Sequence, residues 1–449
     1  MTALMTGDPI RLAWAAGAVV LWLAFSIVML WRGRRARPAE ARDGRWLIAV
    51  ASQTGFAEEL AEMTETLLAP TGPVRTVLLG DLEDSDLRAA GRVLFIVSTT
   101  GEGDSPDSAS WFVRKVMGAE ADLHGVRYGL LALGDHTYKD FCAFGRALDG
   151  WLRRSGGEAL FDAVEVDNGE AGAVRHWQHQ VAAAAGAMAQ ADWTPPALDR
   201  WRLVERRLMN PGSPGASAFH LAFEPLDGIR DWAAGDIAEI GLPPVDGVSP
   251  GSREYSIASL PSDGRLELLL RLMLRPDGTP GLTSGWLTQT ITVGDQVLMR
   301  TRTNRSFHGP APETPMILIG NGTGIAGLRA HLKARAAAPS ADTWLMFGER
   351  TAAHDSFYDS ELQAWRASGA LTRLDRVFSR DAGDGRYVQA LVTEHATEIS
   401  RWVARGAAIY VCGSLEGMAP GVQAALEAAL GADRLVELAD SGRYRRDVY

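Results

Sequence analysis

A long, largely apolar run without charge lies near the start of the chain. Residues 12–31 contain no charged side chain over 20 positions. In a helix that rises about 1.5 Å per residue, this length spans the roughly 30 Å hydrocarbon core of a bilayer. A cleaved signal peptide would instead need positive charge before a shorter run and a small-x-small site after it. Arginines follow the run directly, at Arg32, Arg34, Arg35, Arg37, Arg42 and Arg45. We therefore predict one transmembrane helix within 1–31, a basic tether over 32–45, and everything beyond on the cytoplasmic side of an inner or cell membrane.

From residue 46 the pattern changes to short apolar runs that alternate with helical segments. Apolar runs at 46–52, 92–98 and 128–134 each end in a polar loop. Residues 57–68 have the pattern of a helix, and the Ala-rich stretch 181–191 closes the region. Strands that alternate with helices are typical of a doubly wound parallel sheet. We expect this domain over 46–191, followed by a stiff Pro-containing linker at 192–198.

Two further regions follow the linker. Between 199 and 310, short apolar segments are separated by Gly, Pro and Asp, which predicts antiparallel strands that form a β-barrel. From 311 to 449 the alternation of strands and helices returns, with apolar runs at 316–320, 343–349 and 408–413. The predicted fold class is therefore α/β multidomain: a doubly wound parallel sheet, then an antiparallel β-barrel, then a second α/β domain, with the helix near the N-terminus.

Composition and charge exclude several classes of protein. Of 449 residues, 46% are hydrophobic and 22% are charged, so large cores are expected and disorder is not. The two cysteines exclude a disulfide framework and a four-cysteine cluster, no HExxH pattern occurs, and we predict no metal site. Residues 46–190 contain 21 Asp and Glu against 11 Lys and Arg. This acidic segment disfavours nucleic acid and would attract a basic protein partner, although solubility alone explains it equally well.

Three polar loops follow three successive predicted strands. The first spans 52–57, the second 98–106 and the third 133–141. Hydroxyl groups and backbone N–H groups at a helix N-terminus make an anion cradle, and such loops lie together at the carboxyl edge of a parallel sheet. Ser and Thr are also ordinary helix caps, so the first loop by itself is a weak signal.

The three loops together resemble the FMN loops of flavodoxin domains, most closely those of the diflavin reductases (sulfite reductase flavoprotein and the NADPH–cytochrome reductases). The resemblance implies that the first loop holds the FMN phosphate and that the other two flank the isoalloxazine. Where some members carry an aromatic residue, this chain has Thr100. The residues carried over are Ser52, Gln53, Thr54, Gly55, Phe56, Ala57, Ser98, Thr99, Thr100, Gly101, Gly103, Leu133, Gly134, Asp135, Tyr138 and Phe141.

The segment Arg253-Glu-Tyr-Ser256 lies at a predicted barrel strand. It resembles the Arg-x-Tyr-Ser flavin signature of the ferredoxin–NADP reductase family, although an amphipathic strand would give a similar pattern. By this resemblance Arg253 lies near the pyrophosphate of FAD, Tyr255 covers the flavin ring, and the Ser256 hydroxyl lies near its reactive nitrogen. A second segment with Gly281, Thr283 and Ser284 resembles the part of that family that meets the FAD pyrophosphate, where Ser284 opens a predicted helix.

A glycine cluster at 320–327 follows a strand and precedes a helix, which suits the pyrophosphate of a dinucleotide. A tight turn would need glycine in any case. The segment resembles the NADPH loop of the same family, with Gly322, Thr323 and Gly324 in contact with the nucleotide. Because that family usually has proline where Asn321 and Gly327 stand, we expect a looser loop here.

Basic side chains after a later strand predict which nicotinamide coenzyme binds. Ser379, Arg380, Arg386, Tyr387 and Gln389 match the family's 2′-phosphate grip, and paired arginine N–H donors suit a phosphate. An acid that grips a ribose hydroxyl would suit NAD instead. Solvated arginines with no ligand are the other possibility. We predict NADPH.

The last residues complete the predicted catalytic set. Cys412 matches a cysteine that the family places beside the nicotinamide, Asp447 matches its near-terminal acid, and Tyr449 matches a terminal aromatic that covers FAD and moves aside as a gate. With Ser256 these are the predicted catalytic residues. A small buried cysteine and a frayed terminal ring would look the same in sequence.

The resemblance covers 46–449 and implies a membrane-anchored diflavin reductase. Electrons would pass from NADPH to FAD, then to FMN, and then to a one-electron acceptor such as a haem protein or a ferric chelate. The flavoprotein component of an assimilatory sulfite reductase is one alternative, and a non-catalytic assembly module with degenerate flavin sites is another. The stretch 199–310 leaves no room for the helical insert of about a hundred residues that diflavin reductases usually carry.

Overall fold

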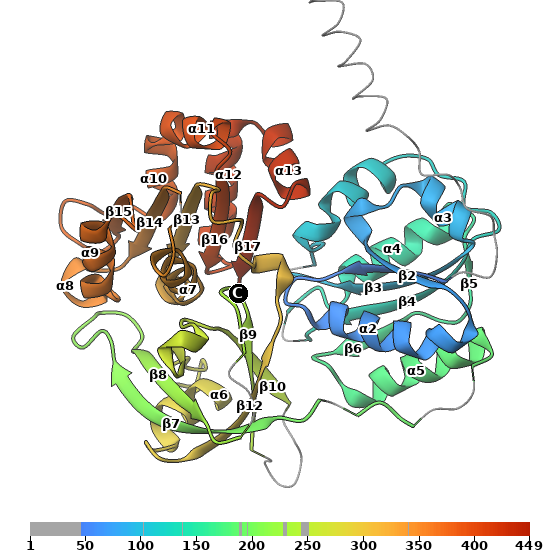
Figure 1. Cartoon of the computed structure of the whole chain (residues 1–449), viewed down its shortest axis with the longest axis horizontal. Coiled ribbons are helices and arrows are strands. Elements are labelled where there is room, and N and C mark those ends of the chain that lie inside the picture. The colour runs from blue at the N-terminus through green and yellow to red at the C-terminus, as the bar shows by residue number, and fades with distance from the viewer. Residues whose placement is uncertain are drawn as a thin grey trace, which may run out of the picture. The chain divides into compact units, whose positions relative to one another are not determined.

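The computed structural model describes residues 46–449, except 102, 137, 188–190, 195, 228–230, 244–250 and 340. The predicted transmembrane helix and basic tether lie outside the described residues. Within the described ranges, none of the helices is both long enough and apolar enough to cross a bilayer. Gly44–Tyr449 forms one compact unit by itself, and three sheets follow one another along it (Figure 1).

The first sheet is parallel throughout. Its order is β2-β1-β3-β4-β5, with β6 also paired to β4. This is the strand order of flavodoxin-like folds, in which the order reverses between the first and third strands. The strands are β1 (Trp46–Ala51), β2 (Val74–Leu78), β3 (Arg92–Ser98), β4 (Arg127–Gly134), β5 (Glu158–Ala159) and β6 (Val164–Asp167).

Apolar cores cover both faces of this sheet. Alternate residues of β1 enter opposite cores, with Leu47 and Ala49 on one side and Trp46 and Ile48 on the other. Helices pack on both faces (Figure 1). One face carries α3 (Asp84–Ala90) and α4 (Ala143–Arg154), and the other carries α2 (Phe56–Leu68) and α5 (Ala171–Ala185).

The second sheet is antiparallel, with the order β10-β9-β12-β7-β8-β11. Its two ends meet, because Ala258 N, just after β10, donates to Glu267 O in β11 at 2.8 Å. The predicted barrel requires this closure. The strands are β7 (Asp199–Leu208), β8 (Ala218–Pro225), β9 (Ile237–Gly241), β10 (Ser252–Ser256), β11 (Leu266–Arg271) and β12 (Gln296–Arg302), with the short helix α6 (Leu282–Gly285) between β11 and β12.

The third sheet is parallel, with the order β15-β14-β13-β16-β17. Helices α7 and α9 contribute to the core on one face, and α10 to α13 to the core on the other. The strands are β13 (Met316–Asn321), β14 (Thr343–Glu349), β15 (Arg373–Phe378), β16 (Ala408–Gly413) and β17 (Tyr444–Val448). The helices are α7 (Ile325–Ala336), α8 (Ala352–Asp355), α9 (Asp359–Ser368), α10 (Val388–Glu394), α11 (Ala396–Ala404), α12 (Met418–Leu430) and α13 (Ala432–Asp440).

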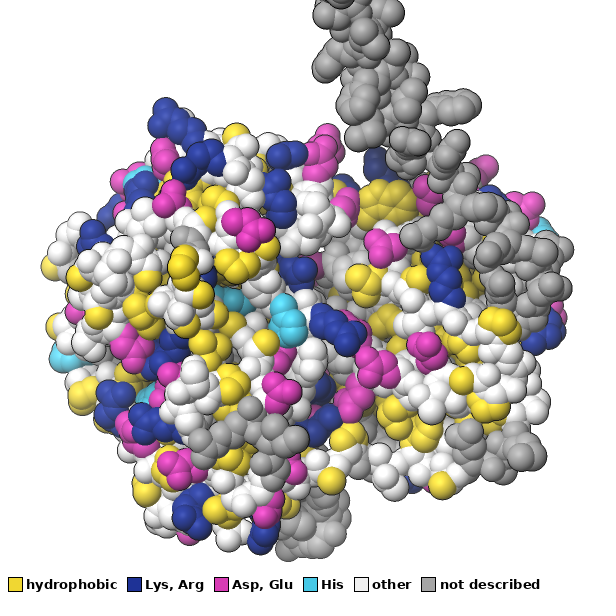
Figure 2. All heavy atoms as spheres, viewed as in Figure 1, with side chains coloured by type: hydrophobic (Ala, Val, Ile, Leu, Met, Phe, Trp, Pro, Cys, Tyr) yellow, Lys and Arg dark blue, Asp and Glu magenta, His cyan; other side chains and the backbone are white. Residues whose placement is uncertain are grey.

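The predicted succession of a flavodoxin-like parallel sheet, an antiparallel sheet and a second parallel sheet is therefore present. One local boundary differs from expectation, because α6 begins at Leu282 and not at Ser284. On the face shown in Figure 2, basic and acidic side chains of the described residues are interspersed with small apolar areas.

Candidate functional site

Ser256, Cys412 and Asp447 meet at the carboxyl ends of β10, β16 and β17. Ser256 Oγ donates to Asp447 Oδ2 at 2.6 Å, and Cys412 Sγ donates to the same oxygen at 3.6 Å. Cys412 and Asp447 are direct partners in the register of β16 and β17. The main chain of Tyr449 is tied beside them, because its N–H donates to Gly413 O at 3.1 Å. Residues predicted separately from three segments thus form one cluster.

Burial determines the protonation of this cluster. Asp447 is only 6% exposed, and this burial raises its pKa although hydrogen bonds from Ser256 and Cys412 act in the opposite direction. Burial also raises the pKa of the Cys412 thiol well above its ordinary value, and the neighbouring Asp447 carboxylate raises it further. Cys412 is therefore a thiol donor, and Asp447 is the ionisable carboxyl of the cluster.

A cavity of about 900 Å³ lies against the cluster. This volume is within the range of cofactor pockets. Tyr449 is 48% exposed, and its hydroxyl donates to Thr323 Oγ1 at 3.2 Å, so the terminal ring extends from the cluster towards the glycine loop. Predicted residues that line the cavity are Thr54, Tyr255, Ser256, Ser284, Gly322, Thr323, Ser379, Arg380, Tyr387, Gln389, Asp447 and Tyr449.

Six residues predicted for the FAD and NADPH sites do not line this cavity. They are Arg253, Gly281, Thr283, Gly324, Arg386 and, buried behind Asp447, Cys412. Arg386 pairs with Asp384 at 2.6 Å and with Glu394 at 2.7 Å. In contrast, Arg380 lines the cavity and is exposed, and its side chain has no hydrogen bond or ion pair to the described residues. The arrangement favours Arg380 over Arg386 as the contact for a 2′-phosphate.

The glycine loop at 320–327 packs closely against the end of β16. A Cβ on Gly324 would lie 2.1 Å from the carbonyl oxygen of Cys412, so only glycine fits there. Asn321 Oδ1 accepts a hydrogen bond from Ser414 N at 3.0 Å. The loop that we expected to be looser without proline is therefore tied to the segment after Cys412 by an asparagine side chain.

The three predicted FMN loops follow β1, β3 and β4 at one edge of the first sheet. Gly55 has a φ of +85°, and its N–H donates to Ser52 Oγ at 2.9 Å as the chain turns into α2. The second and third loops are joined because Thr99 N donates to Leu133 O at 2.8 Å. The ring of Tyr138 is 38% exposed at this edge.

The residues of this edge fit FMN. The helix α2 begins after a glycine, which has no side chain to cap the first amides, so these amides can bind an anion. In the second loop, Thr99 Oγ1 is buried without a hydrogen-bond partner among the described residues. A polar ligand between the loops would satisfy it.

The first FMN loop contacts residues from the other two sheets. Arg302 Nε donates to Thr54 O at 3.0 Å, and Gln53 Nε2 donates to Arg446 O at 2.6 Å. Nearby, both terminal nitrogens of Arg300 donate to the Glu59 carboxylate, at 2.7 and 2.9 Å. The guanidinium of Arg446 pairs with Asp107. Part of the acidic excess of residues 46–190 is therefore neutralised by arginines of the same chain.

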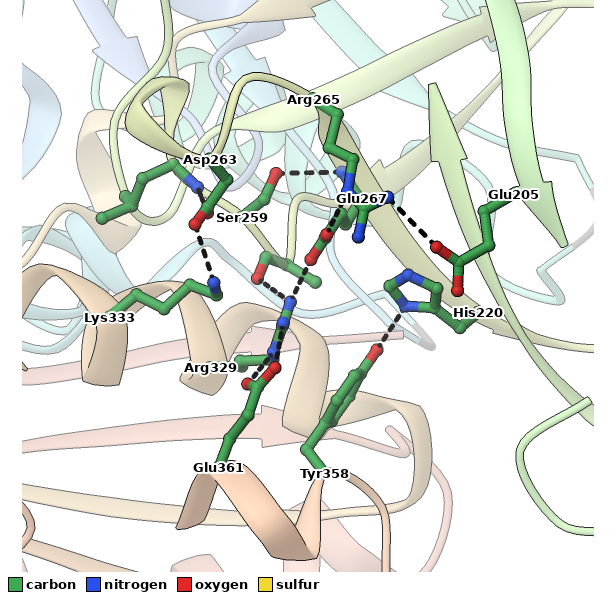
Figure 3. A network of polar contacts seen from close by, with 12 residues as sticks. Glu205, His220, Ser259, Asp263, Arg265, Glu267, Arg329, Lys333, Tyr358 and Glu361 are labelled. Carbon is green, nitrogen blue, oxygen red and sulfur yellow. Dashed lines mark hydrogen bonds and ion pairs between the residues drawn. The ribbon is translucent and has the colours of Figure 1, made fainter. Parts of the chain in front are cut away.

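A buried polar network joins the antiparallel sheet to the third sheet (Figure 3). Arg329 of α7 donates to Glu267 of β11 at 2.5 Å and to both oxygens of Glu361 of α9 at 2.6 Å. Beside it, Tyr358 OH and His220 Nδ1 are 3.1 Å apart. The Arg329 and Glu267 side chains are only 4% and 5% exposed. The network fixes the two walls of the cavity relative to each other.

A second set of residues that line the cavity was not predicted from the sequence. Arg271 ends β11, Glu349 ends β14, and the two form an ion pair in the cavity wall. Arg350 and Glu254 also line it. The distance between Arg271 and Glu349 in the sequence leaves no local pattern for this pair. Glu349 alone could have been found as an acid at the end of a strand that follows a glycine loop.

Comparison with known proteins agrees with the geometry. Residues 48–177 match the family model of flavodoxin, and residues 318–424 match that of the oxidoreductase NAD-binding domain. The sulfite reductase [NADPH] flavoprotein alpha-component of Escherichia coli strain K12 is 27% identical over 98% of this chain and 95% of its own length. That of Vibrio vulnificus is 26% identical over 92% of this chain and 88% of its own length.

These findings support the resemblance to the diflavin reductases. The chain is an NADPH-dependent flavoprotein oxidoreductase. Its cofactors are FMN, FAD and NADPH. The alignment with the Escherichia coli relative extends over 575 positions, more than the 449 residues of this chain. More than a hundred of those positions are therefore gaps here.

Proposed function

We propose that the chain carries electrons from NADPH to a separate one-electron acceptor. When bound, the nicotinamide would supply a hydride to FAD, and electron transfer from FAD to FMN would allow release of single electrons, which bridges two-electron and one-electron chemistry. One observation supports this most strongly. Thr54 of the first FMN loop lines the same cavity as Tyr255 and Tyr449. The predicted FMN and FAD sites therefore adjoin.

The residues of this chain bind, orient and gate the cofactors. Ser256 and Cys412 both hydrogen-bond Asp447 and so hold its carboxyl beside the place proposed for the nicotinamide ring. Tyr449 covers the flavin ring and moves aside as the gate. Arg380 holds the 2′-phosphate with Ser379, Tyr387 and Gln389. The domains that we propose are 46–191 for FMN, 199–310 for FAD and 311–449 for NADPH, with the linker at 192–198.

The first candidate for the acceptor is the haemoprotein partner of a sulfite reductase. Two observations favour it: the relatives are named as flavoprotein components of that enzyme, and the alignments cover almost the whole of both chains. In this candidate function the chain is the flavoprotein component of an assimilatory sulfite reductase.

A second candidate is a membrane-bound acceptor. The uncharged run at 12–31 and the arginines after it favour a single-pass anchor next to the FMN domain, with the catalytic domains in the cytoplasm. An anchored FMN domain would release electrons near the bilayer to a haem-containing membrane protein or a ferric chelate reducing system.

The test is NADPH-driven reduction of an acceptor panel by the purified full chain, with and without native membranes. The panel holds a ferric chelate, a soluble haem protein, and a sirohaem haemoprotein with sulfite. Sulfide formation only with the sirohaem protein supports the first candidate. Haem reduction that requires membranes supports the second. Failure to reduce any member, including the ferric chelate, contradicts the proposed electron transfer.

A further inference from the structure

A buried carboxylate lies in the wall of the nucleotide cavity where a phosphorylated coenzyme should bind. Glu349 lines the cavity, and its side chain is 4% exposed. Its Oε2 accepts a hydrogen bond from Arg350 N at 2.6 Å. A Cβ on Gly322 would lie 3.5 Å from Glu349 Oε1, so the carboxylate is next to the glycine loop.

The place of Glu349 in the fold is the place of an NAD-selecting acid. In α/β dinucleotide folds, an acid about 20 residues after the glycine loop hydrogen-bonds the ribose hydroxyls and so favours NAD. Glu349 follows Gly324 by 25 residues and ends β14, the strand after the glycine loop and α7. A carboxylate without a cationic partner at this position would accept hydrogen bonds from a ribose diol and repel a 2′-phosphate.

Arg271 forms an ion pair with this carboxylate and so masks its negative charge. The residue comes from β11 of the antiparallel sheet, and its Nη2 pairs with Glu349 Oε1. Its Nη1 donates to Ala216 O at 2.8 Å, and its guanidinium lies 5.7 Å from the ring centre of Phe357. These contacts hold the guanidinium beside both the glutamate and the glycine loop. Both Nε and Nη2 of Arg271 lie 4.0 Å from the position of a Cβ on Gly322.

The pairing changes the charge that a nucleotide meets. Burial raises the pKa of Glu349, while the Arg271 charge lowers it. A partly buried guanidinium that pairs with the carboxylate removes the carboxylate's repulsion and presents its own remaining edge to the anionic coenzyme.

We propose that Arg271 is a specificity-determining residue, which neutralises Glu349 and thereby lets the cavity prefer the 2′-phosphorylated coenzyme over NAD. The inference rests on the proposed function and concerns its coenzyme selectivity. The residue belongs to the FAD-binding sheet, so selectivity depends on two domains together.

The experiment compares binding of NADP⁺ and NAD⁺ to the flavin-loaded full chain by calorimetric titration at about pH 8, where Glu349 is expected to be ionised. The variants are Arg271→Met, Glu349→Gln and the double variant. Met keeps the apolar contact with Phe357 and loses the charge. Gln keeps the acceptor for Arg350 N and loses the charge.

In Arg271→Met we expect the preference for NADP⁺ over NAD⁺ to fall by about 10- to 100-fold, in the range of close charge pairs at binding sites. In the double variant the preference should return to within about threefold of wild type, because no carboxylate is left to mask. An equal loss of affinity for both coenzymes in Arg271→Met, or no recovery in the double variant, overturns the inference.

If Arg271→Met does not fold, Glu349→Gln provides the test instead. It should keep or improve NADP⁺ binding, and a tenfold loss of NADP⁺ affinity overturns the inference.

The proposed function and the proposed role of Arg271 fail in different ways. A wild-type protein that binds neither coenzyme contradicts the proposed function. A wild-type protein that selects NADP⁺, with variants that select it equally well, contradicts only the role of Arg271.

Discussion

Ser256 and Asp447 share a 2.6 Å hydrogen bond although 191 residues separate them in the chain. Ser256 ends a strand of the antiparallel sheet and Asp447 lies in the last strand of the third sheet. The bond therefore joins the proposed FAD site to the proposed nicotinamide site. The Arg329 network between the same two sheets holds this geometry in place.

Asp447→Asn tests the charge at this junction. Asn keeps the shape of the side chain and can still accept from Ser256, but it carries no negative charge. We expect the rate of flavin reduction by NADPH, followed by stopped-flow absorbance, to fall by about 100-fold or more. Thermal melting provides the control and should change little. An unchanged rate would contradict the assignment of Asp447.

Arg380→Ala and Arg386→Ala are a matched pair. Arg380 lines the cavity, whereas Arg386 is paired with Asp384 and Glu394. We expect Arg380→Ala to raise the KM for NADPH by about 10- to 100-fold and to leave the KM for NADH nearly unchanged, because only NADPH carries the 2′-phosphate. Arg386→Ala should change either value by less than about threefold. Equal effects of Arg380→Ala on the two coenzymes would refute the 2′-phosphate role.

Tyr449→Ala tests the gate. In the proposed mechanism the terminal ring leaves the cavity wall before a nicotinamide enters, and a coenzyme with less binding energy displaces the ring less readily. Its removal should raise kcat/KM for NADH by about tenfold, measured by steady-state reduction of a ferric chelate. Tyr449→Phe keeps the ring and should behave like wild type. Unaltered NADH kinetics in the alanine variant would argue against a gate.

Arg329→Met tests the buried network. The substitution removes the partner of the buried Glu267 Oε2 and leaves only the more exposed Arg265, which pairs with Oε1 at 2.9 Å. Loss of one member of a buried pair costs about 3–5 kcal/mol. The free energy of unfolding in urea should fall by this amount. Arg401→Ala is the control, because the Arg401 side chain is 71% exposed in its pair with Glu398 and should contribute less than about 1 kcal/mol. A similar decrease in the free energy of unfolding in both variants would show that burial of the ion pair does not determine the size of the decrease.

His331 gives the protein a predicted sensitivity to acid. Complete burial between Phe307 and Tyr410 lowers its pKa from the ordinary 6.5 to about 3. The native imidazole stays neutral while the unfolded one gains a proton below pH 6.5, so stability present above that pH is lost as the pH falls towards 3. His331→Leu should remove a slope of about 1.4 kcal/mol per pH unit from the urea unfolding free energy over this range. Identical slopes in the two proteins would mean that His331 is not the group responsible.

Much of the site was predictable because its residues end strands with clear apolar patterns. Cys412 lies at the end of an apolar run, and Ser256 ends the alternating segment Arg253–Ser256, so the sequence indicates that both lie at strand ends. Parallel topology then brings the loops after β1, β3 and β4 to one edge. The assignment of Arg386 to the phosphate grip has no support, because its acids Asp384 and Glu394 compete for the guanidinium.

The contacts that could not be predicted are side-chain pairs between residues far apart in the sequence. Arg446 and Asp107 are 339 positions apart, and Arg300 and Glu59 are 241 apart. No local pattern marks which of the many arginines meets which acid, because the choice is made by the packing of separate sheets. The masking of Glu349 by Arg271 belongs to the same class.

The central claim is that this chain holds two different flavins. Denaturing the purified protein by heat and separating the released flavins by chromatography tests it directly. We expect release of one FMN and one FAD per chain, in about equal amounts. Release of a single flavin species, or of none, from protein purified in the presence of both would contradict it.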